Sequence, residues 1–371
     1  MRKKVLLPLT VVAVMAFTAG INHAAEWGLK KGTPELKSAG PLAFGPDGIL
    51  FVGDTKSATI FAIQTDDGSD KPSDAKLNIK AVNESIADLL KARAAGVTIN
   101  DLAVNPRSGN IYLSVTKKHE SEPVPALIRI NGAGKLGVVS LKSIAFSKVT
   151  LPNPPDDKLT GRGRRRRNRR SESITDLAYF DGKLMVSGLT NNSAPSAVRQ
   201  VAFPFASADQ GTIVEIYHGA HGRLESGSVV RAFVPFNING EPSLLAGFQC
   251  TPLVKFPVKG LTPGKKIRGT TVAELGNRNR PLDMIVYKKD GKDFLLMANS
   301  ARGVMKISTE NLGRKEGITE RVSGGGTAGQ TYETIEELKG VVQLDRLNDE
   351  SAIILVKTES GASNLQTIAL P

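Results

Sequence analysis

Three aspartates and one arginine occupy the same position in a repeated sequence pattern. Asp101, Asp176 and Asp283 begin the segments DLAV, DLAY and DMIV, and Arg231 begins RAFV. Side chains that a repeat gathers at one level could hold a cation, a carboxylate ligand or ordered water. The commoner use of an aspartate near a strand start is to accept hydrogen bonds from backbone amides of its own or a neighbouring turn. The sequence leaves both interpretations open.

Further arginines lie close to one of these strand starts. Arg278 and Arg280 in GNRNRPLDM precede Asp283. With Arg231 they could attract a carboxylate, sulfate or phosphate, because guanidinium groups bind planar anions through paired hydrogen bonds. Alternatively, these arginines pair with the recurring aspartates and neutralise them.

Two histidines and a single cysteine complete the candidate chemistry. His218 and His221 lie three residues apart in YHGAHGR, a spacing that can present two imidazoles to one metal ion or to a ligand, although no third ligand can be identified. Cys250 is the one cysteine, which excludes a disulfide framework within the chain. No histidine occupies an equivalent repeat position, so a small, buried, unreactive thiol is the favoured interpretation of Cys250.

Six copies of one pattern position these residues. Each copy has an apolar strand, a Gly or Asp turn, a second apolar strand, a small-residue step and a third strand. The copies begin at Pro41, Asp101, Asp176, Arg231, Asp283 and Gly340. This pattern predicts an all-β fold, a six-bladed β-propeller, in which equivalent positions converge on a central axis. We therefore expect Asp101, Asp176, Arg231, Asp283, Asn299, Arg280, His218 and His221 to line an axial funnel.

The outermost strands predict how the ring closes. Candidate outer strands follow the first five copies, at Lys76, Lys135, Thr212, Ile267 and Gly317. The sixth copy has none, and an unpaired sheet edge is unfavourable. Residues 27–37 are available, so we predict that the mature N-terminal segment closes the ring as the outer strand of the sixth blade.

The first 25 residues have the pattern of a secretory signal peptide. Arg2, Lys3 and Lys4 precede an apolar run from Val5 to Ala19, and Ala24 and Ala25 are small residues suited to cleavage. The run is shorter than the ~20 residues that span a bilayer. We predict a leader over residues 1–25 and a single propeller domain over 26–371, monomeric, without a transmembrane span after cleavage, and located in a periplasm or secreted.

A basic insertion separates the second and third copies. The segment GRGRRRRNRR, residues 161–170, carries seven arginines, more than half of the formal net charge of +13. We predict a disordered loop over about 152–172 in which Arg164, Arg165, Arg166 and Arg167 bind a polyanion such as an anionic envelope polymer, lipid headgroups or extracellular nucleic acid. The alternative is a tolerated low-complexity loop. No aromatic residues are interleaved, so specific nucleic-acid binding by base stacking is not expected.

Two segments resemble a known superfamily. PLAFGPDGILFVGDTKSATIFAI and PLDMIVYKKDGKDFLLMANSARGVMKI are similar to the repeats of NHL and gluconolactonase-like six-bladed propellers. In the gluconolactonase-like branch a divalent cation such as Ca²⁺ lies at the axis on Glu, Asn and Asp side chains. By repeat position the resemblance implies Asp283 and Asn299 as ligands, whereas Pro41 stands where that branch has its Glu. The NHL branch implies ligand or protein binding.

Two functions follow from these observations. The first is an exported binding module or interaction scaffold that engages a small anionic ligand or a protein partner at the axial funnel. The alternative is a metal-dependent lactonase-like hydrolase. Its cation would lie on Asp283, Asn299 and one of Asp101 or Asp176, where it would polarise a carbonyl and activate water.

Overall fold

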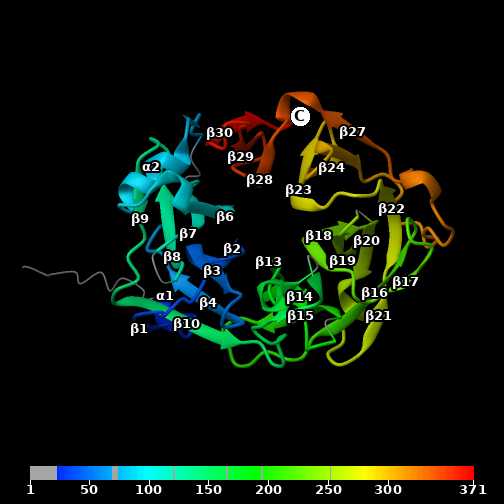
Figure 1. The fold of residues 1–371 in the computed structure, drawn as a ribbon, viewed down its shortest axis with the longest axis horizontal. Helices are drawn as coiled ribbons and strands as arrows, with labels where there is room; N and C mark the ends of the chain where they lie inside the picture. The colour runs from blue at the N-terminus through cyan, green and yellow to red at the C-terminus, as the bar shows by residue number, and fades with distance from the viewer. Residues whose placement is uncertain (1–22, 69–73, 120–121, 164–165, 194, 251) are drawn as a thin grey trace, which may run out of the picture.

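The structure is a computed structural model that describes residues 23–68, 74–119, 122–163, 166–193, 195–250 and 252–371. Six twisted sheets stand around a common axis, so the predicted six-bladed β-propeller is confirmed (Figure 1). Most of the predicted leader lies outside the described residues, and the signal peptide therefore stays a prediction. Within the described part of the chain, none of the helices has the length and apolar character needed to cross a membrane.

The blades are numbered here in chain order, and each contains antiparallel strands beginning with the one nearest the axis. Blade 1 contains β2 (Leu42–Phe44), β3 (Ile49–Asp54), β4 (Thr59–Gln64), β10 (Ile144–Thr150) and β1 (Lys30–Gly32). Blade 2 contains β6 (Val97–Val104), β7 (Ile111–Lys117), β8 (Val124–Ile130) and β9 (Leu136–Val138). Blade 3 contains β13 (Asp176–Phe180), β14 (Lys183–Leu189), β15 (Ser196–Ala202), β16 (Thr212–His218) and β17 (Arg223–Glu225), with β21 (Lys266–Arg268) parallel to β16.

The second half of the chain forms the other three blades. Blade 4 contains β18 (Val230–Ile238), β19 (Glu241–Phe248), β20 (Pro252–Pro257), β22 (Thr270–Leu275) and β26 (Thr327–Gly329). Blade 5 contains β23 (Pro281–Lys289), β24 (Lys292–Asn299), β25 (Gly303–Ser308) and β27 (Tyr332–Ile335). Blade 6 contains β28 (Val341–Arg346), β29 (Ser351–Lys357), β30 (Ser363–Ala369) and β5 (Asn78–Ile79). Two short helices, α1 (His23–Glu26) and α2 (Val82–Leu89), lie outside the blades.

The blades do not follow one another around the ring in chain order. The inner strand β2 contacts β6 on one side and β13 on the other, and β6 in turn contacts β28. The order around the axis is therefore 2, 1, 3, 4, 5, 6, as the blue strands between the cyan and green ones show (Figure 1). After completing the inner strands of blade 1, the chain steps back to build blade 2.

This exchange overturns the predicted closure by the N-terminal segment. The outer strand of blade 6 is β5, which pairs with β30 through Leu365 and Ile79. The N-terminal strand β1 instead pairs with β10 at the edge of blade 1. The reason is proximity, because β5 immediately precedes blade 2, the neighbour of blade 6. The edge that β5 leaves on blade 1 is filled by β10 after blade 2 is complete.

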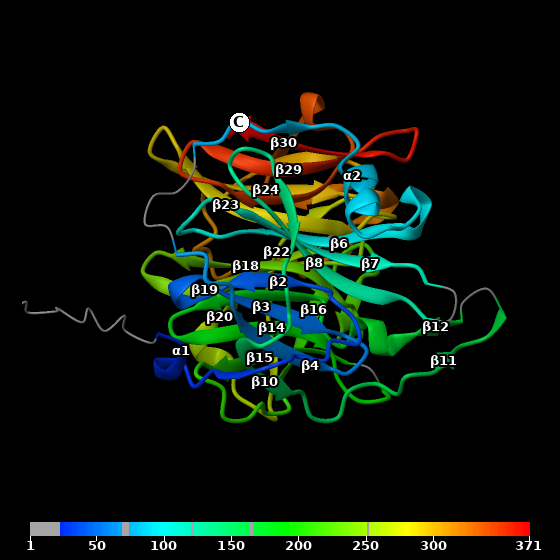
Figure 2. The same ribbon diagram turned by 90° about the vertical axis from the view of Figure 1, so that its left-hand side faces the viewer.

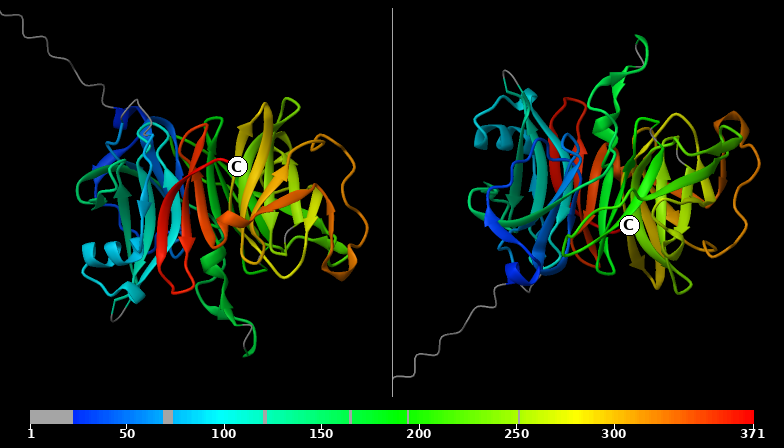
Figure 3. Two further views of the ribbon diagram at one scale, coloured as in Figure 1. Left: turned by 90° about the horizontal axis from the view of Figure 1, so that it is seen from above. Right: turned by 90° about the horizontal axis from the view of Figure 1, so that it is seen from below.

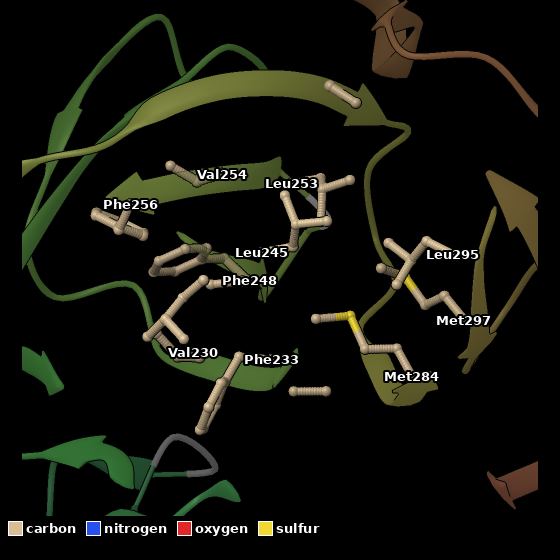
Figure 4. Packing of buried hydrophobic residues seen from close by; sticks show 14 of the residues in the cluster. Val230, Phe233, Leu245, Phe248, Leu253, Val254, Phe256, Met284, Leu295 and Met297 are labelled. Atoms are coloured by element: carbon tan, nitrogen blue, oxygen red, sulfur yellow. The ribbon is translucent and has the colours of Figure 1, made fainter. Parts of the chain in front are cut away.

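The apolar faces of the blades pack against one another. Between blades 4 and 5, Met284 and Met297 face the side chains of Leu245 and Phe233 (Figure 4). Leu245 and Met297 are completely shielded from solvent. Burial of such a side chain contributes about 1.5–3 kcal/mol, so the inter-blade layers hold the inner strands, and the side chains they carry, in fixed positions.

Candidate functional site

The inner strands carry a ring of aspartates that links neighbouring blades. The Oδ2 atoms of Asp101, Asp176 and Asp283 accept the backbone N–H groups of Leu42, Phe233 and Leu344, at 2.7, 2.7 and 2.8 Å. In each case the donor lies on an adjacent blade. The carboxyl groups therefore act as clamps between blades, as the commoner interpretation of these aspartates predicts.

A fourth aspartate belongs to this ring and was not identified when the repeat copies were aligned. Asp345 Oδ2 accepts the N–H of Val104 at 2.7 Å and so links blade 6 to blade 2. The N–H of Leu344 donates to Asp283, as the N–H of Leu42 donates to Asp101. Gln343 therefore occupies the repeat position that Pro41 holds in blade 1, and Asp345 lies two residues farther along. Residues two apart on a strand share a face, and this spacing was the available signal.

Two cavities open along the axis from this ring. The amino-end cavity, about 380 Å³, lies where the inner strands begin, and the carboxyl-end cavity, about 760 Å³, lies where they end. Asp101, Asp176 and Asp283 line both cavities, whereas Asp345 lines the carboxyl-end one. The three aspartates therefore converge on the axis, as the repeat predicts.

The ring carries less than its formal negative charge at neutral pH. Burial raises the pKa of Asp101 to about 7 and that of Asp345 to about 6. It also raises the pKa of Asp176 and Asp283 well above the usual range, and repulsion from neighbouring carboxylates adds to the effect. The backbone N–H donors oppose the shift but do not cancel it.

Two of the three predicted arginines, Arg231 and Arg280, line the amino-end cavity, whereas Arg278 is exposed and is not among the described residues that line it. Arg231 Nη2 donates to Glu172 Oε1 at 2.7 Å, and its Nε donates to Gln249 Oε1 at 3.1 Å. Its charge is therefore neutralised by an acid that sequence reasoning did not single out. Arg280 lines the same cavity and is exposed to solvent. Of these two arginines, Arg280 is the better placed to receive an anionic group.

Asn299 and Asp283 do not form the cation pair that the resemblance implies. The amide oxygen of Asn299 accepts the N–H groups of Ala301 and Arg302, and its Nδ2 donates to Asn279 Oδ1. Among the described residues that line the two axial cavities, Asn299 is absent. Both oxygens of Asp283 accept backbone N–H groups. With its amide oxygen already accepting two N–H groups, Asn299 does not join Asp283 in a lactonase-type Ca²⁺ site.

His218 and His221 do not belong to the axial funnel, which corrects the prediction. They lie at the end of β16, the fourth strand of blade 3, and outer strands are remote from the axis. Their imidazoles share one carboxylate, Glu225, and lie with Cys250 in a cluster whose potential ligand atoms are all within 4.8 Å of one another. Burial lowers the pKa of His218. These three residues could hold a metal ion.

The basic insertion is a hairpin where its residues are described. The strands β11 (Leu159–Thr160) and β12 (Arg167–Asn168) pair, followed by a short 3-10 turn over Arg169–Glu172. The predicted disorder is not found there, because Arg170 donates from Nε to Pro155 O and from Nη1 to Lys56 O, which ties the base of the hairpin to the propeller. Arg164 and Arg165 lie outside the described residues.

The hairpin projects from the same face as the amino-end cavity. Ser171, at its base, lines that cavity. The start of the described chain, at α1, lies on the opposite face of the ring (Figure 2). Views along the ring edge show the green hairpin and the blue N-terminal segment pointing in opposite directions (Figure 3). The exposed Arg166 and Arg167 therefore stand beyond the mouth of the amino-end cavity.

Comparison with known proteins finds only remote similarity to solved structures. No family model matches the sequence, and no curated protein matches it. A putative oxidoreductase (glucose dehydrogenase) from a Thermus species is 12% identical, with 92% of this chain and 99% of that chain covered and a TM-score of 0.34. The corresponding values are 10%, 93%, 99% and 0.36 for a streptogramin B lyase, and 12%, 92%, 95% and 0.32 for the periplasmic gluconolactonase of Pseudomonas aeruginosa. Similarities this remote carry no argument about this chain, and the propeller assignment rests on its own strand pairing.

Proposed function

We propose that this protein is an exported binding propeller that holds a small hydroxylated anion in its amino-end cavity. Besides three aspartates, two arginines and several small or apolar residues, the cavity lining includes hydroxyl and amide side chains, namely Ser38, Thr55, Asn100, Thr116, Ser171, Thr175 and Gln343. Its volume of about 380 Å³ suits a small molecule better than a protein segment. Export rests on the leader pattern of residues 1–25.

The observation that carries this proposal is an unused acceptor in the cavity wall. Gln343 Oε1 is buried and has no hydrogen-bond partner among the described residues, while its Nε2 donates to Asn100 O at 3.2 Å. A buried acceptor without a partner costs about 1–3 kcal/mol, which a ligand hydroxyl would recover by donating to it. Arg280 at the rim would bind the anionic group of the same ligand.

The lactonase-like alternative has less support. It requires a cation between Asp283 and Asn299, and the hydrogen bonds of Asn299 hold its amide in the turn after β24. The aspartates also spend both oxygens on backbone N–H groups, as Asp176 does with Leu177 and Phe233. A binding role needs none of these groups to be released.

The test compares gluconate with sorbitol, which has a similar chain of hydroxyl groups but no carboxylate. Calorimetric titration of the mature protein is expected to show gluconate binding and weaker sorbitol binding. Arg280→Gln is expected to weaken gluconate binding about 10-fold or more, because a hydrogen bond to a charged group contributes about 1.5–3 kcal/mol.

Arg346→Gln is the matched control for this titration. Arg346 is a partly exposed arginine that lines the carboxyl-end cavity, so its loss should leave gluconate binding unchanged. Absence of gluconate binding by the unaltered protein, or an equal loss in both variants, would contradict the proposal.

We further propose that the basic hairpin tethers the protein to a polyanion. The support is the position of Arg166 and Arg167, exposed on a hairpin that stands out from the ring. Replacing Arg164, Arg165, Arg166 and Arg167 with glutamine is expected to remove most of the retention on immobilised heparin, with elution at much lower salt, because each lost ion contact reduces the number of counterions released on binding.

The control for the hairpin variant removes the same charge elsewhere. Lys30, Lys31, Lys142 and Lys148 are exposed on or beside blade 1, and their replacement by glutamine should change the elution salt little. Equal elution of the two variants would show that net charge, and not the hairpin, governs the retention.

A further inference from the structure

One carboxylate holds both imidazoles of the His218 and His221 pair. His218 Nδ1 lies 2.9 Å from Glu225 Oε2, and His221 Nδ1 lies 2.8 Å from Glu225 Oε1. The two rings lie close together, with centroids 3.8 Å apart. Glu225 is itself held by Ser228 Oγ at 2.5 Å and by Arg223 Nε at 2.9 Å. The orientation of the two rings is therefore fixed from behind.

This arrangement leaves the outer nitrogens free to bind a metal. An imidazole that donates from Nδ1 to a carboxylate keeps its lone pair on Nε2, which is the usual setting of a metal-binding histidine. His218 is 1% exposed, and its Nε2 has no hydrogen-bond partner among the described residues. A buried ring nitrogen without a partner is rare in folded proteins and indicates a missing ligand.

The third donor comes from the neighbouring blade. Cys250 lies in the turn between β19 and β20 of blade 4, and its Sγ lies within 4.8 Å of one ring nitrogen of each histidine. Its backbone has a φ of 64° and its N–H donates to Asn279 O at 2.9 Å, so the turn is held in the left-handed region that non-glycine residues seldom adopt. Zinc bonds of about 2.0–2.3 Å require ligand atoms somewhat closer together, which a small side-chain rotation supplies.

We infer that His218 Nε2, His221 Nε2 and Cys250 Sγ bind one zinc ion that joins blades 3 and 4. Two imidazoles and a thiolate suit zinc and exclude Ca²⁺ and Mg²⁺, which prefer oxygen ligands. The thiol proton passes to the buffer when the Cys250 sulfur binds. The His221 side chain is 43% exposed, so the ion is reachable from solvent, and three protein ligands leave a fourth position for water.

The test uses the mature protein without a polyhistidine tag, stripped with a chelator and titrated with Co²⁺ as a spectroscopic substitute for zinc. We expect saturation at one ion per chain, a near-ultraviolet thiolate-to-cobalt band, and displacement of the cobalt by one equivalent of Zn²⁺. Cys250→Ser should remove the thiolate band, and His218→Ala should abolish stoichiometric binding. Glu225→Gln should weaken zinc binding about 10- to 100-fold as a positioning residue.

His119→Ala is the control, since His119 lies in the loop between β7 and β8 of blade 2 and should leave the titration unchanged. Circular dichroism of each variant confirms that the propeller is folded. The zinc site would be overturned by a lack of saturable Co²⁺ or Zn²⁺ binding at micromolar concentration, or by an unchanged zinc affinity in Cys250→Ser. It would also be overturned if Cu⁺ saturated the site and Zn²⁺ neither bound with similar affinity nor displaced the Cu⁺. None of these measurements depends on the gluconate or heparin experiments.

Discussion

Replacing Gly188 with alanine is expected to destabilise the propeller by about 3 kcal/mol, the upper end of the usual cost of overpacking. A Cβ atom at this position would lie 2.1 Å from the carbonyl oxygen of Ser173 and 2.5 Å from its carbonyl carbon. Both are backbone atoms, so no side-chain rotation can relieve the contact. The strand β14 or the segment that enters β13 would have to move.

The reason for this tight contact lies in how each blade begins. The chain enters blade 3 by crossing the end of β14, where Thr175 N donates to Ser187 O at 2.9 Å. Blade 1 repeats the arrangement, since Gly40 N donates to Gly53 O at 2.8 Å. Gly53, Ser187, Gly247 and Ala298 hold the corresponding place in four blades, and Gly188 directly follows Ser187. The small-residue step of the sequence repeat is therefore a packing requirement at the axis.

Urea unfolding followed by circular dichroism measures the effect on Gly188. The matched control is Gly137→Ala, a strand glycine of β9 with no atom within 4 Å of the added Cβ. That substitution should leave stability unchanged or raise it slightly, by about 0.4–1 kcal/mol, through the lower entropy of the unfolded chain. Similar unfolding midpoints for the two variants would show that the crossing in blade 3 has room to spare.

The local parts of the fold could be predicted from the sequence, and the long-range parts could not. Alternating apolar residues and turn residues define each three-strand unit over a short stretch of chain, which is why six blades were found. Which blade an outer strand joins is decided by contacts between segments that are far apart in the sequence. The short strand β5 carries no signal that it joins blade 6, and the exchange of blades 1 and 2 follows from that pairing.

The same division holds for the candidate sites. Asp101, Asp176 and Asp283 were found because a repeat places equal positions at equal depth along the axis. The ion pair between Arg231 and Glu172 depends on the fold of the insertion, which was predicted from the sequence to be disordered. Cys250 meets His218 because the outer edge of blade 3 lies against a turn of blade 4, and the absence of a repeat-equivalent histidine says nothing about such a contact.

The propeller is expected to lose stability as the pH rises from about 5 to 8. Burial raises the pKa of Asp101 to about 7 from an ordinary value of 3.8. Between these values the folded chain holds a proton that the unfolded chain has released, so the free energy of unfolding falls as the pH increases. Asp345, with a pKa of about 6, and the buried Glu274, with a pKa of about 7, act in the same direction.

One group limits this trend at low pH. Although burial raises the pKa of Glu225, the hydrogen bonds from Ser228 and His218 lower it to about 2, below its ordinary value of 4.5. The stability that Glu225 contributes is therefore present above pH 4.5 and is lost as the pH falls towards 2. Above pH 4.5 the groups with raised pKa outweigh Glu225, so the maximum of stability lies below that pH.

Melting temperatures of the mature protein between pH 4 and 8 check this expectation. Asp101→Asn removes one carboxylate acceptor of the inter-blade clamp and lowers stability at every pH. The slope of melting temperature against pH is therefore compared, and not the melting temperature itself. The slope between pH 4 and 7 should be shallower in Asp101→Asn and unchanged in Glu350→Gln, an exposed control in the turn after β28.

A melting temperature that rises from pH 5 to 8, or an equal slope in Asp101→Asn, would show that the aspartate ring is fully ionised at neutral pH. That result would also bear on ligand binding, because three aspartates of the ring line the amino-end cavity. Full negative charges there would repel an anion that enters past Arg280. A ring that retains protons near neutral pH weakens this repulsion and offers a hydrogen-bond donor, so the same pH profile tests the electrostatic basis of anion binding.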